Sequence, residues 1–231
     1  MADDDAAGNG MDLARDRLLD AVLPHVAFDG WSEVSLRAGI AGSGVAPGLA
    51  RALFPRGGVD LALAWHRRGD ALMAAALAAR DLSALRHREK VALAVRVRLE
   101  VIPDAEAVRR GAALLALPQH AADGAGAIWG TADAIWVCLG DSSTDINWYT
   151  KRATLSALYG ATVLYWLGDD SADHAATWAF LDRRIEDVMA IEKVRAKMRD
   201  NPLWRAIAAG PLKAMPKPRM PKVPEDLPGR G

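Results

Sequence analysis

Apolar residues recur at spacings of three and four along most of the chain, a pattern typical of amphipathic helices. Ala92, Val95 and Leu99 make one such stripe, and Ile128, Ala132, Ile135 and Leu139 make another. The alternating pattern of β-branched and polar residues that marks a strand does not occur. The sequence therefore predicts an all-α fold of about nine or ten helices.

Glycine, proline and capping residues separate the predicted helices. These helices cover approximately residues 11–28, 36–42, 46–54, 60–79, 84–102, 105–117, 118–139, 146–167, 172–199 and 203–212. Pro24 is expected to bend the first of them. Ser43-Gly44-Val45 separates the second from the third, as the tight turn of a helix-turn-helix does. A tail with six prolines follows residue 210 and is expected to be extended or disordered.

The predicted helix at residues 146–167 is apolar on almost every side, so protein, a partner subunit or a ligand must surround it. It mixes small side chains such as Ala157 and Gly160 with bulky ones such as Leu155 and Leu158. Small side chains leave room for a neighbour. From the residues alone, that neighbour is either another helix or a lipid tail.

Overall charge suggests no partner, because 29 basic side chains balance 29 acidic ones. Its distribution is uneven. Residues 1–60 carry five Arg against nine Asp and Glu, a net charge of −4, whereas residues 183–231 carry twelve Lys and Arg against six Asp and Glu, a net charge of +6. We therefore expect an anionic surface to bind the C-terminal part of the chain, residues 183–231.

The chemistry of the chain favours a non-enzymatic protein of the cytoplasm. The single Cys138 excludes an internal disulfide framework and fits a reducing compartment. The start of the chain lacks the features of a signal or transit peptide, and the longest uncharged stretch, residues 153–168, is too short to span a bilayer. The five histidines have no metal-binding spacing, and neither a nucleophile elbow nor a phosphate loop is found, so we expect no metal, no cofactor and no turnover.

The first sixty residues resemble the DNA-binding end of TetR-type regulators in Gly44-Val45, Gly48 and Phe54-Pro55, with Leu61 starting the connecting helix. The predicted recognition helix reads Ala-Pro-Gly-Leu-Ala-Arg-Ala-Leu, in which only Arg51 could donate a hydrogen bond to DNA. Neutralising phosphates supplies most of the affinity for DNA, and this region is net negative. We therefore expect a retained scaffold that binds no nucleic acid.

A longer motif lies in the second half. It comprises Asp133-Ala134-Ile135-Trp136, Gly140-Asp141, Ser143-Thr144-Asp145-Ile146-Asn147-Trp148-Tyr149-Thr150-Lys151-Arg152, Thr177-Trp178, Phe180-Leu181 and Arg183-Arg184-Ile185. This motif resembles the signature of the coenzyme Q biosynthesis accessory family, a TetR-like lipid-binding family known in mitochondria and in related bacteria. Phe28-Asp29-Gly30-Trp31 and Leu53-Phe54-Pro55-Arg56-Gly57 resemble its bacterial branch.

The resemblance implies a non-enzymatic homodimer that binds an isoprenoid lipid, such as a ubiquinone precursor, in a hydrophobic pocket between helices. It would present this lipid to the di-iron hydroxylase that acts late in the pathway, at the inner face of the cytoplasmic membrane. The candidate lipid-binding residues are Trp136, Leu155, Leu158, Tyr159, Ala161 and Thr162. The candidate partner-binding residues are Ile135, Trp148 and Tyr149, and the candidate membrane-contacting residues are Leu203, Trp204 and Ile207.

The resemblance also implies a domain organisation. It comprises a disordered N-terminus (residues 1–10), a helix-turn-helix-like subdomain (11–58), a lipid-binding and dimerisation bundle (59–200), a short amphipathic helix (201–214) and a proline-rich tail (215–231).

Several alternatives stay open at the level of sequence. Trp148 and Tyr149 either pack at the start of a helix or form a surface patch, and Ile135 is equally well placed for the core. The segment around Leu203 either docks on the domain or touches a membrane. The alternative function is a TetR-type regulator whose hydrophobic ligand is sensed in the same pocket.

Overall fold

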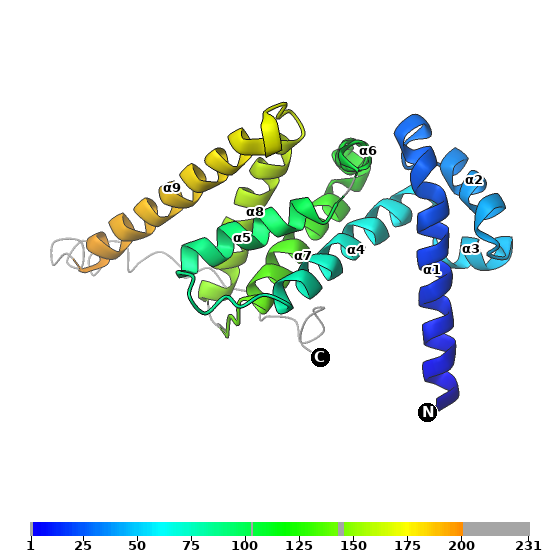
Figure 1. The fold of residues 1–231 in the computed structure, drawn as a ribbon, viewed down its shortest axis with the longest axis horizontal. Helices are drawn as coiled ribbons and strands as arrows, with labels where there is room; N and C mark the ends of the chain where they lie inside the picture. Colours follow the sequence, from blue (N-terminus) through cyan, green and yellow to red (C-terminus); the bar gives the residue numbers. More distant parts are fainter. Residues whose placement is uncertain (1, 103, 143–145, 201–231) are drawn as a thin grey trace, which may run out of the picture.

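The computed structural model describes residues 2–102, 104–142 and 146–200, and the side chains of residues 10–102, 104–142 and 147–190. All regular structure in these ranges is helical (Figure 1). The α-helices are α1 (Ala2–Asp29), α2 (Glu33–Ser43), α3 (Pro47–Leu53), α4 (Gly58–Ala78), α5 (His87–Glu100), α6 (Ala105–Leu115), α7 (Ala121–Cys138), α8 (Ile146–Trp166) and α9 (Ala175–Asp200). Two single 3₁₀ turns, η1 (Pro118–His120) and η2 (Ala172–His174), precede α7 and α9. The predicted all-α fold is confirmed.

Two hydrophobic cores organise these helices. The first joins α1, α2 and α3 to the beginning of α4, with Leu18, Leu36 and Phe54 among its buried residues. The second joins the end of α4 to α5, α7, α8 and α9, with Met73 and Leu99 among its buried residues. Helix α4 contributes to both cores, and Figure 1 shows it running from the α1–α3 group into the larger bundle.

Local capping explains several helix ends. The Ser32 hydroxyl accepts a hydrogen bond from the Ser35 amide at the start of α2 (3.3 Å), and Gly44 ends that helix in the left-handed conformation, with φ of 69°. The Asp104 carboxylate accepts from the Ala107 amide at the start of α6 (3.0 Å). Asp169 accepts from the Thr177 amide (2.8 Å) and so caps α9. Gly44, Asp104 and Asp169 lie where the sequence predicted helix boundaries, whereas the cap at Ser32 was not predicted.

Several helix starts differ from the prediction. Helix α2 begins at Glu33, three residues earlier than predicted, and the 3₁₀ turn η1 precedes α7, which begins three residues later than predicted. Helix α1 begins at Ala2, so residues 2–10 are helical rather than disordered. Helix α5 begins three residues later than predicted, because Arg86 and Glu89 form a capping box in which the Arg86 amide donates to Glu89 (2.9 Å). The 3₁₀ turn η2 precedes α9, which therefore also begins later than predicted.

The predicted helix at residues 203–212 and the proline-rich tail lie outside the described residues. Within the described part of the chain, none of the helices combines the length and apolar character that crossing a bilayer requires.

Trp31 connects the N-terminal helices to α6 and α4. Its indole Nε1 donates to the Ala107 carbonyl of α6 (3.0 Å), and its ring lies 5.5 Å from that of Trp65 on α4. The Trp31 backbone passes so close to Gly58 that a Cβ at position 58 would lie 2.1 Å from the Trp31 carbonyl oxygen. Only glycine fits there without moving the main chain.

Replacing Gly58 with alanine is expected to lower the free energy of unfolding by about 2–3 kcal/mol, because the added methyl group overlaps backbone rather than a movable side chain. The matched control is Gly126→Ala on α7, where a Cβ meets nothing within 4 Å. That control should instead raise the free energy of unfolding by about 0.5–1 kcal/mol through helix propensity. Urea unfolding of both variants checks the prediction, and equal effects would contradict it.

Candidate functional site

A buried polar cluster joins α4, α5 and α7. Arg98 of α5 has no exposed surface; its Nε donates to Asp70 Oδ1 (2.6 Å) and its Nη2 donates to the His66 carbonyl (2.9 Å), both on α4. Thr131 of α7 donates its hydroxyl to the same Asp70 oxygen (2.8 Å). Asp70 thus compensates the Arg98 charge and at the same time holds α7.

His66 is the titratable group of this cluster. Its Nε2 lies 2.8 Å from the Thr131 hydroxyl oxygen and 3.2 Å from the Ala127 carbonyl oxygen. Because Thr131 donates to Asp70, the His66 ring donates to Thr131. Burial lowers the pKa of His66 to about 4, with the Asp70 charge opposing this shift and the Arg98 charge adding to it. The ring is therefore neutral at pH 7, and the cluster holds the helices together.

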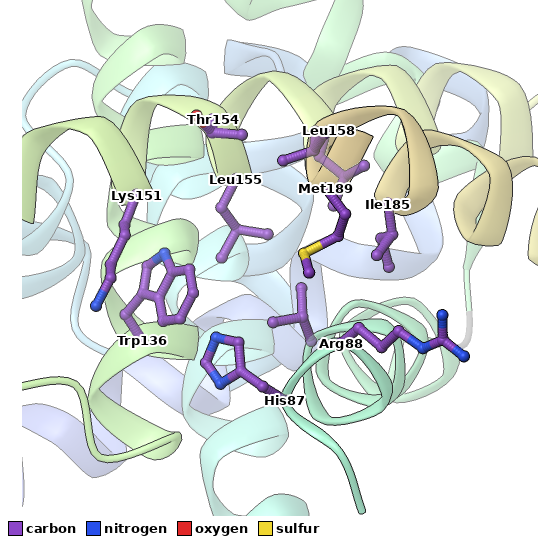
Figure 2. A pocket seen from close by; sticks show the side chains of 11 residues that line it. His87, Arg88, Trp136, Lys151, Thr154, Leu155, Leu158, Ile185 and Met189 are labelled. Carbon is purple, nitrogen blue, oxygen red and sulfur yellow. The ribbon is translucent and has the colours of Figure 1, made fainter. Parts of the chain in front are cut away.

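The candidate ligand site is a pocket of about 130 Å³ between α5, α7, α8 and α9 (Figure 2). It is lined by His87, Arg88, Val91, Trp136, Lys151, Thr154, Leu155, Leu158, Ile185, Val188 and Met189. Most of its wall is apolar, whereas three of the lining residues are basic or carry an imidazole. An apolar cavity with few polar groups is the usual form of a small-molecule site.

Trp136 dominates one side of the pocket. Its side chain is 7% exposed, and its indole Nε1 is buried without a hydrogen-bond partner among the described residues. The His87 imidazole stacks on the indole, with 5.3 Å between ring centroids and 22° between planes. The Lys151 ammonium lies 5.3 Å from the centre of the indole and forms an ion pair with Asp141 (2.6 Å). The pocket therefore combines an aromatic wall with an unused hydrogen-bond donor.

An aromatic and charged cluster lies beside the pocket, at the start of α8. The Arg152 side chain, 2% exposed, donates to Asp133 (2.5 Å) and to Asp141 (3.1 Å). Its guanidinium carbon lies 4.0 Å from the centre of the Trp148 ring, and the Trp148 and Tyr149 rings meet edge to face, 4.8 Å apart. Asp141 links this cluster to Lys151 and so to the pocket.

The structure brings half of the predicted lipid-binding residues to the pocket. Trp136, Leu155 and Leu158 line it. The others do not: Tyr159 is buried beside Arg98, with its ring 6.0 Å from the guanidinium, and Thr162 is buried and donates to the Leu158 carbonyl of its own helix (2.8 Å). Ala161 is half-buried and lies outside the lining.

Sequence reasoning missed the wall formed by α5 and the residues of α9. His87, Arg88 and Val91 lie about fifty residues before the motif that carried the resemblance. The apolar spacing of Ile185 and Val188 was visible, but it fits a core as well as a pocket. No local signal in the sequence marks these residues as lining one cavity.

On the described surface, the candidate partner-binding residues do not form an exposed hydrophobic patch. Ile135 is fully buried, because it continues the apolar stripe through Ala132 that faces the larger core; of the two positions left open for it in the sequence, the structure shows the core. Trp148 is 8% exposed and Tyr149 is half-buried. Whether these two residues contact a partner stays a prediction. Leu203, Trp204 and Ile207 lie outside the described residues.

The helix-turn-helix is present in α2 and α3, but its one candidate DNA donor is engaged. Arg51 forms a two-pronged ion pair with Glu33 of α2, in which Nη1 donates to Oε2 (3.2 Å) and Nη2 to Oε1. The Arg51 hydrogen bond lowers the pKa of Glu33, which keeps the pair charged. The Arg51 guanidinium is therefore paired within the motif.

Comparison with known proteins extends these observations. A family model described as COQ9 matches residues 121–192, the segment from α7 into α9. The mitochondrial ubiquinone biosynthesis protein COQ9 of Drosophila melanogaster is 33% identical over 195 residues, covering 82% of this chain and 60% of that protein. Its Homo sapiens counterpart is 32% identical over 181 residues, covering 75% of this chain and 57% of that protein.

The chain is similar to the COQ9 family over the segment that its model matches, and to these two relatives over 82% and 75% of its own length. It spans up to about 60% of the length of these curated relatives. The segment matched by the COQ9 model includes every lining residue of the pocket except those of α5. The pocket is thus formed largely by the part of the chain that defines the family.

A solved structure shows the same fold. It is the crystal structure of the TetR transcriptional regulator from Nitrosomonas europaea, which matches with a TM-score of 0.61 and 20% sequence identity and covers 74% of this chain and 95% of that one. This match confirms the predicted TetR-like fold.

The buried His66 predicts a pH-dependent stability. The unfolded chain binds a proton at this ring below about pH 6.5, whereas the folded protein binds it only near pH 4. Between these values the unfolded state holds more protons, so stability is lost as the pH falls. Replacing His66 with glutamine, which keeps a hydrogen-bonding group near the Thr131 hydroxyl, is expected to remove about 2 kcal/mol of the loss between about pH 7 and pH 5. Urea unfolding at both pH values measures this, and parallel pH profiles for the two proteins would contradict it.

Proposed function

We propose that this chain is a non-enzymatic accessory protein of ubiquinone biosynthesis that binds a polyprenyl quinone intermediate. In this proposal it presents the lipid to a partner di-iron hydroxylase at the membrane surface. The observation that carries the proposal is the position of the pocket: an apolar cavity lies within the helices that match the COQ9 family model. The names of the relatives support the pathway, since they are ubiquinone biosynthesis proteins.

The chemistry of the pocket supports a lipid rather than a polar metabolite. Val91, Leu155, Leu158 and Ile185 supply aliphatic surface, and water leaves such surface readily when an apolar ligand enters. The volume of about 130 Å³ is smaller than a whole polyprenyl quinone, so one end of the molecule occupies the pocket and the rest lies outside it.

The free faces of α8 and α9 support a homodimer. Leu164 is 70% exposed, and next to it Tyr165 stacks on Phe180 of α9 with ring centroids 4.5 Å apart. Leu181 and Ile185 of α9 are buried within the chain. An apolar face on the two helices that pair in TetR-like dimers fits a second copy of this chain.

The remaining parts of the proposal concern the partners. A place in the cytoplasm, at the inner face of the cytoplasmic membrane, is supported by the net positive charge of residues 183–231, which favours anionic lipid. For the hydroxylase, the supporting feature is the half-buried Tyr149 with Trp148 behind it. The proposed absence of turnover rests on the sequence, in which the five histidines have no metal-binding spacing and neither a nucleophile elbow nor a phosphate loop is found.

Organic extraction and mass spectrometry of the protein purified from a quinone-producing host test the ligand. We expect a polyprenyl quinone or precursor to co-purify with the wild-type chain. Val188→Trp, which places an indole in the pocket wall, should reduce the extracted lipid by roughly fivefold or more. The matched control is Leu117→Trp at the end of α6, an exposed position outside the pocket. Equal lipid content in the two variants, or no lipid in the wild type, would contradict the proposal.

The alternative function, a TetR-type regulator, predicts binding to duplex DNA with a steep salt dependence. We expect no specific binding in fluorescence anisotropy at either about 50 or about 200 mM salt, because Arg51 is held by Glu33. Glu33→Gln removes the charge of this holding residue and serves as a comparison. Tight, salt-sensitive binding of the wild-type chain to one DNA fragment would favour the regulator.

A further inference from the structure

We propose that α9 is the gate of the pocket: its segment from Leu181 to Met189 swings away from α5 and α8 on the turn at residues 169–174, and the ligand enters through the opening. This inference rests on the proposed function and deepens it, because it identifies which wall of the same pocket moves. It is carried by the way the four walls are held, by the position of the contacts along α9, and by the strained backbone of the turn.

Three of the four walls are held by buried ion pairs and hydrogen bonds. Arg98 of α5 and Thr131 of α7 both donate to Asp70 of α4. Arg152 of α8 donates to Asp133 of α7 (2.5 Å). Moving one of these walls would separate a buried charged group from its partner, which costs much more free energy than separating apolar surfaces. The fourth wall, α9, is therefore the one that moves at the lowest cost.

The polar contacts of the described part of α9 with other segments lie at its start. The Thr177 amide donates to Asp169 (2.8 Å). The guanidinium carbon of Arg96, on α5, lies 4.8 Å from the centre of the Trp178 ring. Among residues 181–190, by contrast, the described side chains form no hydrogen bond or ion pair with another helix. Helix α9 is therefore anchored at one end.

The rest of α9 is held by apolar packing that weakens along the helix. Leu181 is 2% exposed and Ile185 is 7% exposed, whereas Met189 is 37% exposed. Figure 2 shows Ile185 and Met189 reaching from α9 towards α5 at the pocket. Few buried side chains are uncovered when this segment moves, so its opening belongs to the low-cost motions of the fold. Phe180, in the face proposed for a second copy, lies on the anchored side, so a dimer through that face does not hold the swinging segment.

The turn before α9 has the backbone of a pivot. Asp173 and His174 both lie in the left-handed region, with φ of 51° and 53°. Residues other than glycine adopt this conformation mostly singly, and two in succession store strain. His174 Nδ1 is also buried without a partner in the described part of the chain, and the Trp178 indole holds the turn by donating to the Asp173 carbonyl (2.8 Å). Rearranging a strained turn offsets part of the cost of moving α9.

The test locks α9 in place and measures how fast a probe enters. In a Cys138→Ala background, Arg88→Cys on α5 is combined with Met189→Cys on α9, two positions that are exposed and line the pocket. The matched control combines Arg88→Cys with Thr154→Cys on α8, which spans the same pocket and leaves α9 free. The reducible cross-linker dithiobismaleimidoethane joins each pair. Stopped-flow fluorescence of the full chain then follows the uptake of N-phenyl-1-naphthylamine, whose emission rises in apolar surroundings.

We expect the cross-link between α5 and α9 to slow uptake about tenfold, and its reduction to restore the original rate, because opening requires α9 to move. The cross-link between α5 and α8 should change the rate by less than about twofold. Equal slowing by both cross-links would mean that the linker itself obstructs the pocket. No slowing by either would mean that entry does not need α9. Each of these two results would overturn the inference.

If the probe does not bind, distances between spin labels decide. Nitroxide labels on the same cysteine pairs are measured by double electron–electron resonance. We expect the labels at positions 88 and 189 to show an additional, longer distance that the labels at positions 88 and 154 lack. A single narrow distance for both pairs would then overturn the inference. A moving α9 in a protein that yields no quinone on extraction would leave the gate intact and overturn the proposed function.

Discussion

The burial of the Arg98 charge is the constraint on which the larger bundle depends. A guanidinium without solvent contact is tolerated only with an opposite charge and several acceptors around it, and α4 supplies these through Asp70 and the His66 carbonyl. Position 69 is glycine for the same reason, because a Cβ there would lie 2.6 Å from Arg98 Nη1. Once α4 and α5 are locked in this way, the Thr131 hydroxyl fixes α7 against them. Two of the four helices that line the pocket, α5 and α7, are therefore fixed against α4.

A second set of charges connects the pocket to the aromatic cluster at the start of α8. Asp141, whose side chain is 4% exposed, pairs with both Lys151 and Arg152. Lys151 lies against the Trp136 ring in the pocket, and Arg152 lies over the Trp148 ring. A ligand that contacts Trp136 is therefore separated by one ion-pair bridge from the residues proposed to meet a protein partner. The proposed ligand site and the proposed partner-binding residues are thus connected through Asp141.

The sequence predicted those features that depend on neighbours along the chain. Asp104 and Gly44 determine helix ends through local hydrogen bonds and φ angles, so their positions could be inferred from residue type. The apolar circumference of α8 predicted neighbours on all sides, but within the described chain one face lacks them, where Leu164 is 70% exposed. The family was also recognisable, because its motif is long and contiguous through Trp148 and Tyr149.

The remaining features arise from contacts between distant segments. The burial of Arg98 could not be inferred from α5 alone, where nearby Arg88 and Arg96 look alike in sequence but lie in different surroundings. The α5 wall of the pocket depends on how that helix crosses α8. Ile135 shows the limit of the family signature. Its place in the motif indicates similarity to the family, but the apolar stripe of α7 determines that its side chain faces the core.

The division into two cores gives two parts of the chain a different tolerance of substitution. Helices α2 and α3 belong to the smaller core, whereas the pocket lies in the larger one, and α4 contributes to both. Substitutions on the outer surface of α2 and α3 change neither core, so the chemistry of that surface can vary while the pocket keeps its shape.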